Sequence, residues 1–223
     1  MADWVTISSL ATAGGTLVLA VATFSSVRSS NRSARVAERS LLVGLRPVLI
    51  PSREGDPLER IRFGDQHILT VPGHGGAVQE KGGVIYFAIA LRNGGSGLAV
   101  LHGWRARARP DVARDELRDR QRTAAAEQRP GLDDFRRQQL DLYIPAGDTG
   151  YWQGAMRDPD EPGYQEVSAA VRAGAPVQVD LLSGDHEGGQ RTIVRFVVSP
   201  WPETEGRRAF TIRYWNVDSD SPR

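Results

Sequence analysis

Residues 84–92, VIYFAIALR, decide the fold class of this chain. β-branched and aromatic side chains dominate the stretch, and such side chains favour a strand within a sheet. The sequence NGGSG at 93–97 follows directly, and we expect Gly94 and Gly97 to adopt the positive φ of a tight turn. Residues 98–108 then predict a second strand, which pairs with the first across that turn.

Other short apolar runs, separated by turns rich in Gly and Pro, extend the pattern beyond this pair. Strands are predicted at 46–51, 59–63, 68–71, 139–144, 149–153, 177–182, 191–199 and 208–215, and a short helix at 164–173. Many short strands with regular turns are typical of a β-sandwich. We therefore expect a mainly β fold, an immunoglobulin-like β-sandwich over residues 47–217, followed by a frayed tail at 218–223.

A charged insertion interrupts the strands at about 110–139, where Asp, Glu and Arg are dense. We interpret it as an exposed helical or partly disordered excursion, divided at Pro130 and Gly131. The two interpretations left open are a solvated loop and an insertion that carries function.

The chain begins with an uncharged segment, residues 4–27, and we expect residues 1–46 to form a transmembrane anchor with a basic juxtamembrane helix. A helix over this segment would be about 36 Å long, which is enough to cross a hydrocarbon core of about 30 Å. Two alternatives are a cleaved signal peptide, for which Ala20-Val21-Ala22 offers a site, and a buried helix of a soluble domain.

Four arginines follow the uncharged segment at helical spacing: Arg28, Arg32, Arg35 and Arg39. They predict contact with an anionic membrane surface, or a solvated face that only obeys the positive-inside rule. Because basic flanks stay in the cytoplasm, we expect a single-pass protein of the cell membrane with its N-terminus outside and its C-terminal domain cytoplasmic. Small residues spaced four apart, such as Ala11 and Gly15, predict weak homo-oligomerisation through the helix.

Composition excludes several function classes. Residues 1–46 hold five basic and two acidic residues, which leaves 23 basic and 25 acidic residues in the remainder, so nucleic-acid binding is not expected. The chain has no Cys, which excludes disulfides, thiol catalysis and zinc sites built on Cys. Its glycine-rich stretches lack the ending of a phosphate-binding loop, so we expect no cofactor.

The triplet Asp185-His186-Glu187 is the strongest candidate in the sequence for metal binding or acid–base catalysis. A neutral imidazole beside carboxylates can bind a metal or act as a base, and His67 and His74 lie in another glycine-rich loop. Glycines flank the triplet, however, which is typical of a hairpin tip. His102, on the same side of its predicted strand as Trp104, is typical of a core histidine.

The stretch 91–99, LRNGGSGLA, resembles a strand–turn–strand element of uncharacterised bacterial membrane-anchored proteins that carry an immunoglobulin-like β-sandwich. The order of anchor, arginine flank, Arg46-Pro47 entry and terminal Tyr214-Trp215-Asn216 is similar to actinobacterial, single-pass members. The resemblance implies the sandwich fold and no activity.

These patterns predict a membrane-anchored, non-enzymatic interaction or regulatory protein, whose partners are the lipid bilayer and another protein. Two alternatives remain: a small metal-dependent hydrolase that uses the histidine loops, and an exported binding domain.

Overall fold

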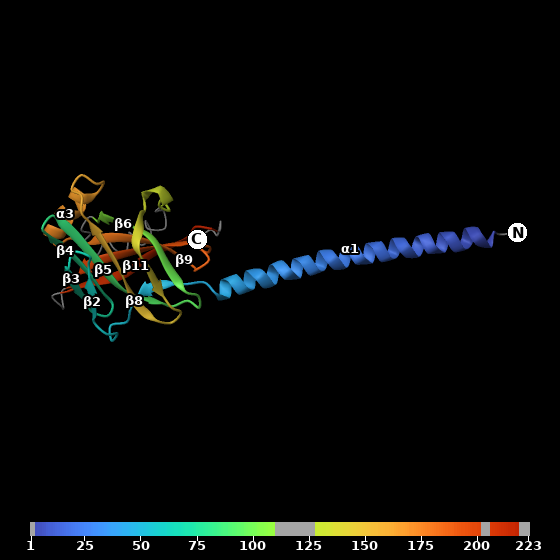
Figure 1. Ribbon diagram of the computed structural model, residues 1–223, viewed down its shortest axis with the longest axis horizontal. Coiled ribbons are helices and arrows are strands. Elements are labelled where there is room, and N and C mark those ends of the chain that lie inside the picture. The colour runs from blue at the N-terminus through green and yellow to red at the C-terminus, as the bar shows by residue number, and fades with distance from the viewer. Residues whose placement is uncertain (1–2, 110–127, 202–205, 219–223) are drawn as a thin grey trace, which may run out of the picture. The chain divides into compact units, whose positions relative to one another are not determined.

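The computed structural model describes residues 3–109, 128–201 and 206–218. The chain separates into two compact units, Met1–Gly44 and Leu45–Arg223. The first contains helix α1, Trp4–Gly44 (Figure 1). Across the described residues, none of the helices combines the length and the apolar character that a membrane crossing requires.

Hydroxyl groups within α1 bond to the backbone of the same helix. The side chains of Thr12, Thr16 and Thr23 each donate to the carbonyl oxygen four residues earlier, at 2.8–2.9 Å, and Ser25 donates to Ala22. This arrangement gives each hydroxyl proton an acceptor without solvent.

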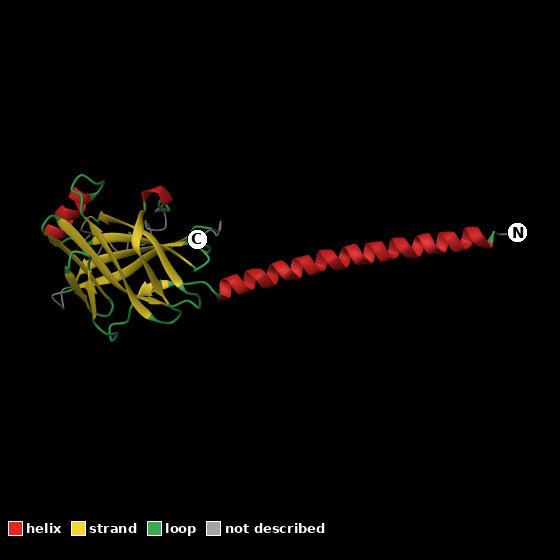
Figure 2. Ribbon diagram, viewed as in Figure 1, coloured by secondary structure: helices red, strands yellow, loops and turns green. Residues whose placement is uncertain are grey.

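In the second unit, here called the β unit, most of the regular secondary structure is antiparallel strand (Figure 2). The strands are β1 (Leu49–Pro51), β2 (Glu59–Arg62), β3 (Ile68–Val71), β4 (Gly75–Lys81), β5 (Val84–Asn93), β6 (Ala99–Ala108), β7 (Arg136–Ile144), β8 (Thr149–Met156), β9 (Val177–Gly184), β10 (Thr192–Pro200) and β11 (Arg207–Asn216). Helix α3 (Tyr164–Arg172) packs on β4 and β6, and a 3-10 turn, η2, covers Leu132–Asp134. The prediction of a mainly β fold after an N-terminal helix is confirmed.

Nine of the strands form one sheet in the order β1-β5-β4-β11-β10-β9-β6-β7, and β8 pairs with β5. The sheet curls around a core that holds large side chains such as Phe87, Trp152 and Phe196. The hairpin β2–β3 forms a second sheet beside β4 and β5 (Figure 1). One continuous curled sheet does not confirm the separate facing sheets of an immunoglobulin-like sandwich.

The strand predicted at 84–92 is present as β5, and both of its faces are buried. Ile85 and Phe87 point into the main core, whereas Tyr86 and Ala88 point into a smaller core under the β2–β3 hairpin. Burial on both faces explains why this strand is apolar from Val84 to Leu91.

The predicted pairing of this strand with 98–108 is wrong, because β5 pairs with β1, β4 and β8, whereas β6 pairs with β7 and β9. The predicted positive φ at Gly94 and Gly97 is also wrong. A Cβ at Gly97 would lie 1.7 Å from the Leu45 carbonyl oxygen, so glycine is needed there for close packing.

A β-bulge at His102 shifts the register of β6, because Leu101 pairs with Ser183 and Gly103 pairs with Leu182. The shift turns Trp104 into the main core, while His102 stays half-buried. The expectation that these two side chains share a face is therefore wrong.

The charged insertion predicted at about 110–139 is only partly within the described residues, since 110–127 lie outside them. Its last part is not an excursion, because β7 begins at Arg136 and pairs with Trp104 of β6. The predicted tail at 218–223 lies outside the described residues except for Asp218, which accepts hydrogen bonds from Arg191.

A buried ion ladder crosses β6, β9 and β10 on the face opposite the main core. Asp180 has no exposed surface and accepts hydrogen bonds from the guanidinium groups of Arg105 and Arg195, each at 2.7 Å. Arg195 lies 4.7 Å from the ring centre of Trp215, and Arg105 also reaches Asp134 at 2.8 Å. Because all three strands carry one member of the ladder, it fixes their register.

Candidate functional site: a groove between two sheet edges

Strands β7 and β8 are consecutive in the chain, yet they lie at opposite ends of the strand order and present free edges to each other. Side chains cross between them. The Trp152 indole donates to the Gln138 side-chain oxygen at 3.2 Å, and the Gln138 amide donates to the backbone oxygen of Gln153 at 3.1 Å. We call the line between the two strands the seam.

A groove of 440 Å³ lies along the seam. It is lined by Trp104 of β6, by the β2–β3 turn (63–64), by β7 (136–140), by β8 (153–155) and by Arg157, which follows β8. The lining thus combines the β2–β3 hairpin, β6 and the β7–β8 pair, which are far apart in the sequence.

Two indole rings pack beneath the groove. A Cβ at Gly154 would lie 2.6 Å from the Trp152 ring and 2.9 Å from the Trp104 ring, so only glycine fits there. The two rings are 5.4 Å apart in an edge-on arrangement. Arg136 covers Trp104 with its guanidinium 5.2 Å from the ring centre, an attractive cation–π geometry.

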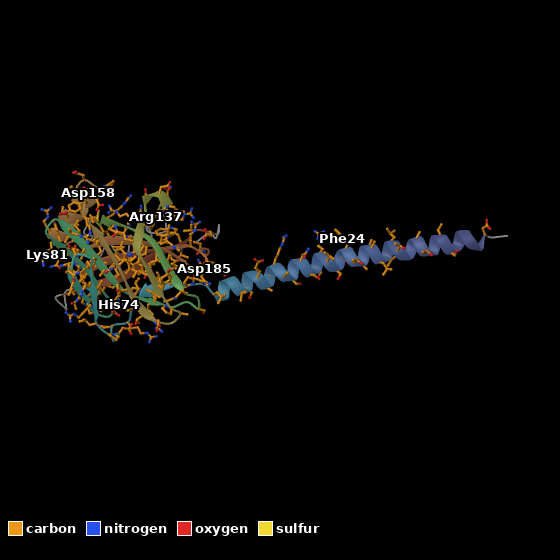
Figure 3. The ribbon with its side chains drawn as sticks, viewed as in Figure 1. Phe24, His74, Lys81, Arg137, Asp158 and Asp185 are labelled. Atoms are coloured by element: carbon orange, nitrogen blue, oxygen red, sulfur yellow. The ribbon has the colours of Figure 1, made fainter. Side chains whose placement is uncertain are left out.

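Every charged residue that lines the groove is an arginine. Arg136 is paired with Glu161, and Arg157 donates to Asp65 at 2.6 Å. Arg137 is exposed (Figure 3), and within the described residues it has no ion pair. Its guanidinium keeps all five donors for a ligand.

The groove also contains a buried acceptor without a donor. The Gln153 side chain is 8% exposed, and among the described residues no group donates a hydrogen bond to its oxygen, Oε1. Such an unsatisfied group costs about 1–3 kcal/mol of folding free energy, so an N–H donor from a ligand would find a prepared partner.

The backbone of β7 is unpaired beside the groove. The ladder pairs Leu142 with Leu101 and Arg137 with Gly103, so β7 advances further than β6 between these two pairs. Residues 138–140 have no paired residue on β6 or β8 within the described ladders.

One wall of the groove is held by a polar cluster. Asp65 accepts hydrogen bonds of 2.6 Å from the Tyr86 hydroxyl and from Arg157, and these bonds hold the pKa of the Asp65 carboxyl far below its ordinary value. Burial and the Asp65 carboxylate raise the pKa of Tyr86. The His67 ring stacks on Tyr86 at 4.2 Å. This cluster fastens the β2–β3 turn to the main sheet.

The predicted histidine loops are not brought together. The Nε2 atom of His67 bonds to the Gln79 side chain at 3.0 Å, whereas Nδ1 of His74 bonds to the Ser52 carbonyl oxygen at 3.2 Å. Figure 3 shows His74 and Asp185 at separate places on the β unit.

Asp185 forms the hairpin tip that its flanking glycines predict. Its side chain accepts backbone N–H bonds from Glu187 at 3.1 Å and from Gly189 at 2.8 Å, while His186 is exposed. No three His, Asp or Glu side chains group as a metal site within the described part of the chain. The structure therefore does not gather the histidine loops of the hydrolase alternative into one site within the described residues.

The predicted membrane-contact arginines all lie on α1. The side chains of Arg28, Arg32 and Arg35 are exposed, and the side chain of Arg39 lies outside what the structure describes. These positions are compatible with a contact surface and with a solvated face.

Sequence reasoning did not identify the groove. No sequence motif marks Gln138, Gln153 or Arg137. These residues line a groove only because the strand order makes β7 and β8 edge strands.

No family model matches the chain, and no curated protein or solved structure shows significant similarity to it.

Proposed function

We propose that this protein is a non-enzymatic interaction or regulatory protein, attached to the cell membrane by α1, whose β unit binds a partner protein in the seam groove. The observation that carries the proposal is the groove itself, where two sheet edges enclose a buried acceptor, and where neither the edges nor the acceptor has a partner within residues 3–109, 128–201 and 206–218. Free edges are frequent sites of strand addition by partner proteins.

The composition of α1 supports attachment to a membrane. Its large apolar side chains, Leu10, Leu17, Val18, Leu19, Val21, Phe24 and Val27, are 53–74% exposed, and Phe24 projects from the helix in Figure 3. An uncharged helical segment such as residues 4–27, with apolar residues on all sides, is stable when lipid or protein covers it. The hydroxyls of Thr12, Thr16, Thr23 and Ser25 bond within the helix, as the hydrocarbon region of a bilayer demands.

The proposed topology is single-pass, with the N-terminus outside and the β unit in the cytoplasm. Support comes from Arg28, Arg32, Arg35 and Arg39, which follow the uncharged segment. Weak homo-oligomerisation through α1 and a distant relationship to the actinobacterial proteins with immunoglobulin-like domains belong to the same proposal. The N-terminal helix followed by an antiparallel β unit supports that relationship.

Fractionation of the full-length protein tests the attachment, and it must separate spanning from surface binding. We expect the full chain to stay with membranes through a high-salt and an alkaline wash, and a chain of residues 45–223 to be recovered in the soluble fraction. Release by salt alone would show attachment through the arginines, and release by alkali would rule out spanning.

Photocrosslinking tests the groove. A photoreactive residue in place of Leu140, at the groove wall, should give a discrete adduct with one partner protein in intact membranes. The same residue in place of Leu58, which is also exposed but does not line the groove, should not. Absence of an adduct at Leu140, or equal adducts at both positions, would contradict binding in the groove.

A further inference from the structure

We propose that the seam groove binds an extended acidic peptide segment, which pairs with the free edge of β7 and places a carboxylate on Arg137. This inference rests on the proposed function and names the chemistry of its partner.

The backbone of β7 favours an extended ligand. Residues 138–140 have no paired residue on β6 within the described ladders, and the Gln138 side chain, instead of a backbone ladder, joins β7 to β8. A peptide in the strand conformation offers N–H and C=O groups at the spacing that such an edge requires.

The Gln153 side-chain oxygen favours a ligand that donates a hydrogen bond. This buried atom, Oε1, lacks a donor among the described residues, and a carboxylate at neutral pH has only acceptors. A peptide backbone supplies an N–H group at every residue other than proline. This requirement favours a peptide over a simple carboxylate.

The arginines favour acidic side chains on that peptide. Arg136, Arg137 and Arg157 are the charged residues of the lining, and the partners of Arg136 and Arg157, Glu161 and Asp65, lie outside it. Arg137 has the full donor set of a guanidinium available for a carboxylate.

Apart from the three arginines and three glutamines, the lining is apolar, and such a mixed surface suits alternating side chains. Trp104 lies beneath the groove, and Leu140 of its wall is 59% exposed. Because successive side chains of a strand point to opposite faces, a peptide that alternates acidic and apolar residues meets both kinds of surface.

Fluorescence anisotropy with the full-length protein in detergent micelles tests the inference. The probe is a labelled six-residue peptide of alternating Glu and Val, and the controls replace every Glu with Gln or with Lys. We expect saturable binding of the acidic peptide, weakened by added salt, and at least about tenfold weaker binding of both controls.

Variants locate the binding. Arg137→Gln should weaken binding of the acidic peptide by about tenfold. Arg53→Gln makes the same charge change at an exposed residue outside the groove and should leave the binding unchanged. Gln153→Met should weaken binding while the melting temperature stays equal or rises, because it removes an acceptor that the free protein leaves unsatisfied. A fall in melting temperature together with unchanged binding would show that Gln153 serves only the fold.

The outcomes separate this inference from the proposed function. Equal binding of the Gln peptide, or a Leu140 adduct with a partner but no binding of the acidic peptide, overturns the acidic chemistry and leaves groove binding intact. A Leu140 adduct with a second copy of the chain overturns it in favour of self-association. Absence of any adduct contradicts the proposed function itself.

Discussion

The side-chain oxygen of Asn93 accepts a hydrogen bond of 3.1 Å from the backbone N–H of Val48, 45 residues earlier in the chain. The same oxygen accepts from Gly95 at 3.0 Å, and the amide nitrogen donates to the carbonyl oxygens of Gly97 and Ile144. One buried side chain therefore joins the segment that enters the β unit, the loop after β5 and the end of β7.

Replacing Asn93 with Ala should lower the free energy of unfolding by about 3 kcal/mol, because four hydrogen-bonding groups lose their partner in a buried place. Chemical denaturation of the purified protein measures the change. Gln139→Ala, at an exposed residue, is the control and should change stability by less than about 0.5 kcal/mol. Equal stability of the two variants would show that the Asn93 bonds contribute little.

Glycine at position 97 is required by contact. Gly97→Ala places a Cβ 1.7 Å from the Leu45 carbonyl oxygen, so we expect a loss of more than about 2 kcal/mol. Gly131→Ala has open space around the new Cβ and should be nearly neutral in the same denaturation experiment. A small change in the free energy of unfolding for Gly97→Ala would mean that residues 45–48, before β1, can move aside.

Much of the strand content was predictable because alternation and turn residues are local signals. The prediction failed where a local signal was overridden by distant contacts. The glycines after β5 matched a hairpin turn, but their neighbours are Leu45 and Val48, which no local pattern reveals. β4 was missed because it begins with Gly75 and Gly76, which occur rarely in strands.

The candidate site was less predictable than the fold. Trp104 faces the core because one extra residue at His102 changes the register, and a bulge leaves no mark in an alternating pattern. The groove depends on which strands lack a neighbour, a property of the whole sheet. Because the charged residues before 139 were interpreted as an insertion, the start of β7 at Arg136, and with it one wall of the groove, was not predicted.

Removing two oppositely charged members of the ion ladder should lower the free energy of unfolding less than removing one member alone. Asp180→Ala leaves Arg105 and Arg195 buried without their shared carboxylate, and we expect a loss of about 3–5 kcal/mol. Adding Arg195→Met should recover part of that loss. Asp148→Ala, at an exposed acid, is the matched control. Strict additivity of the two changes would show that the residues do not interact.

The Asp65 cluster predicts a specific pH dependence. Because the pKa of Asp65 is lowered in the folded state, its carboxylate stabilises the fold above the ordinary pKa of about 3.9, and this contribution is lost as the pH falls below that value. Asp65→Asn should therefore lower the melting temperature at pH 7, and the difference from the unmodified protein should shrink toward pH 3. A difference that is constant with pH would exclude the charged form as the source.

Reporter fusions test the proposed orientation. A reporter that is active only in the cytoplasm should work when fused after Arg223, and a reporter that requires export should not. Replacing Arg28, Arg32, Arg35 and Arg39 with Gln and adding Lys before Trp4 should weaken or invert this preference. An exported C-terminus in the unmodified fusion would favour the alternative of an exported binding domain.

The position of β11 has a consequence for synthesis of the protein on the ribosome. This last strand lies between β10 and β4, with Arg207 opposite Gly76 on one side and Pro200 on the other. Before it emerges, the nascent chain holds two partial sheets, each with an open edge that can pair with another chain. The two partial sheets are therefore joined only after translation has reached Asn216. A ribosome that stops earlier releases an aggregation-prone product.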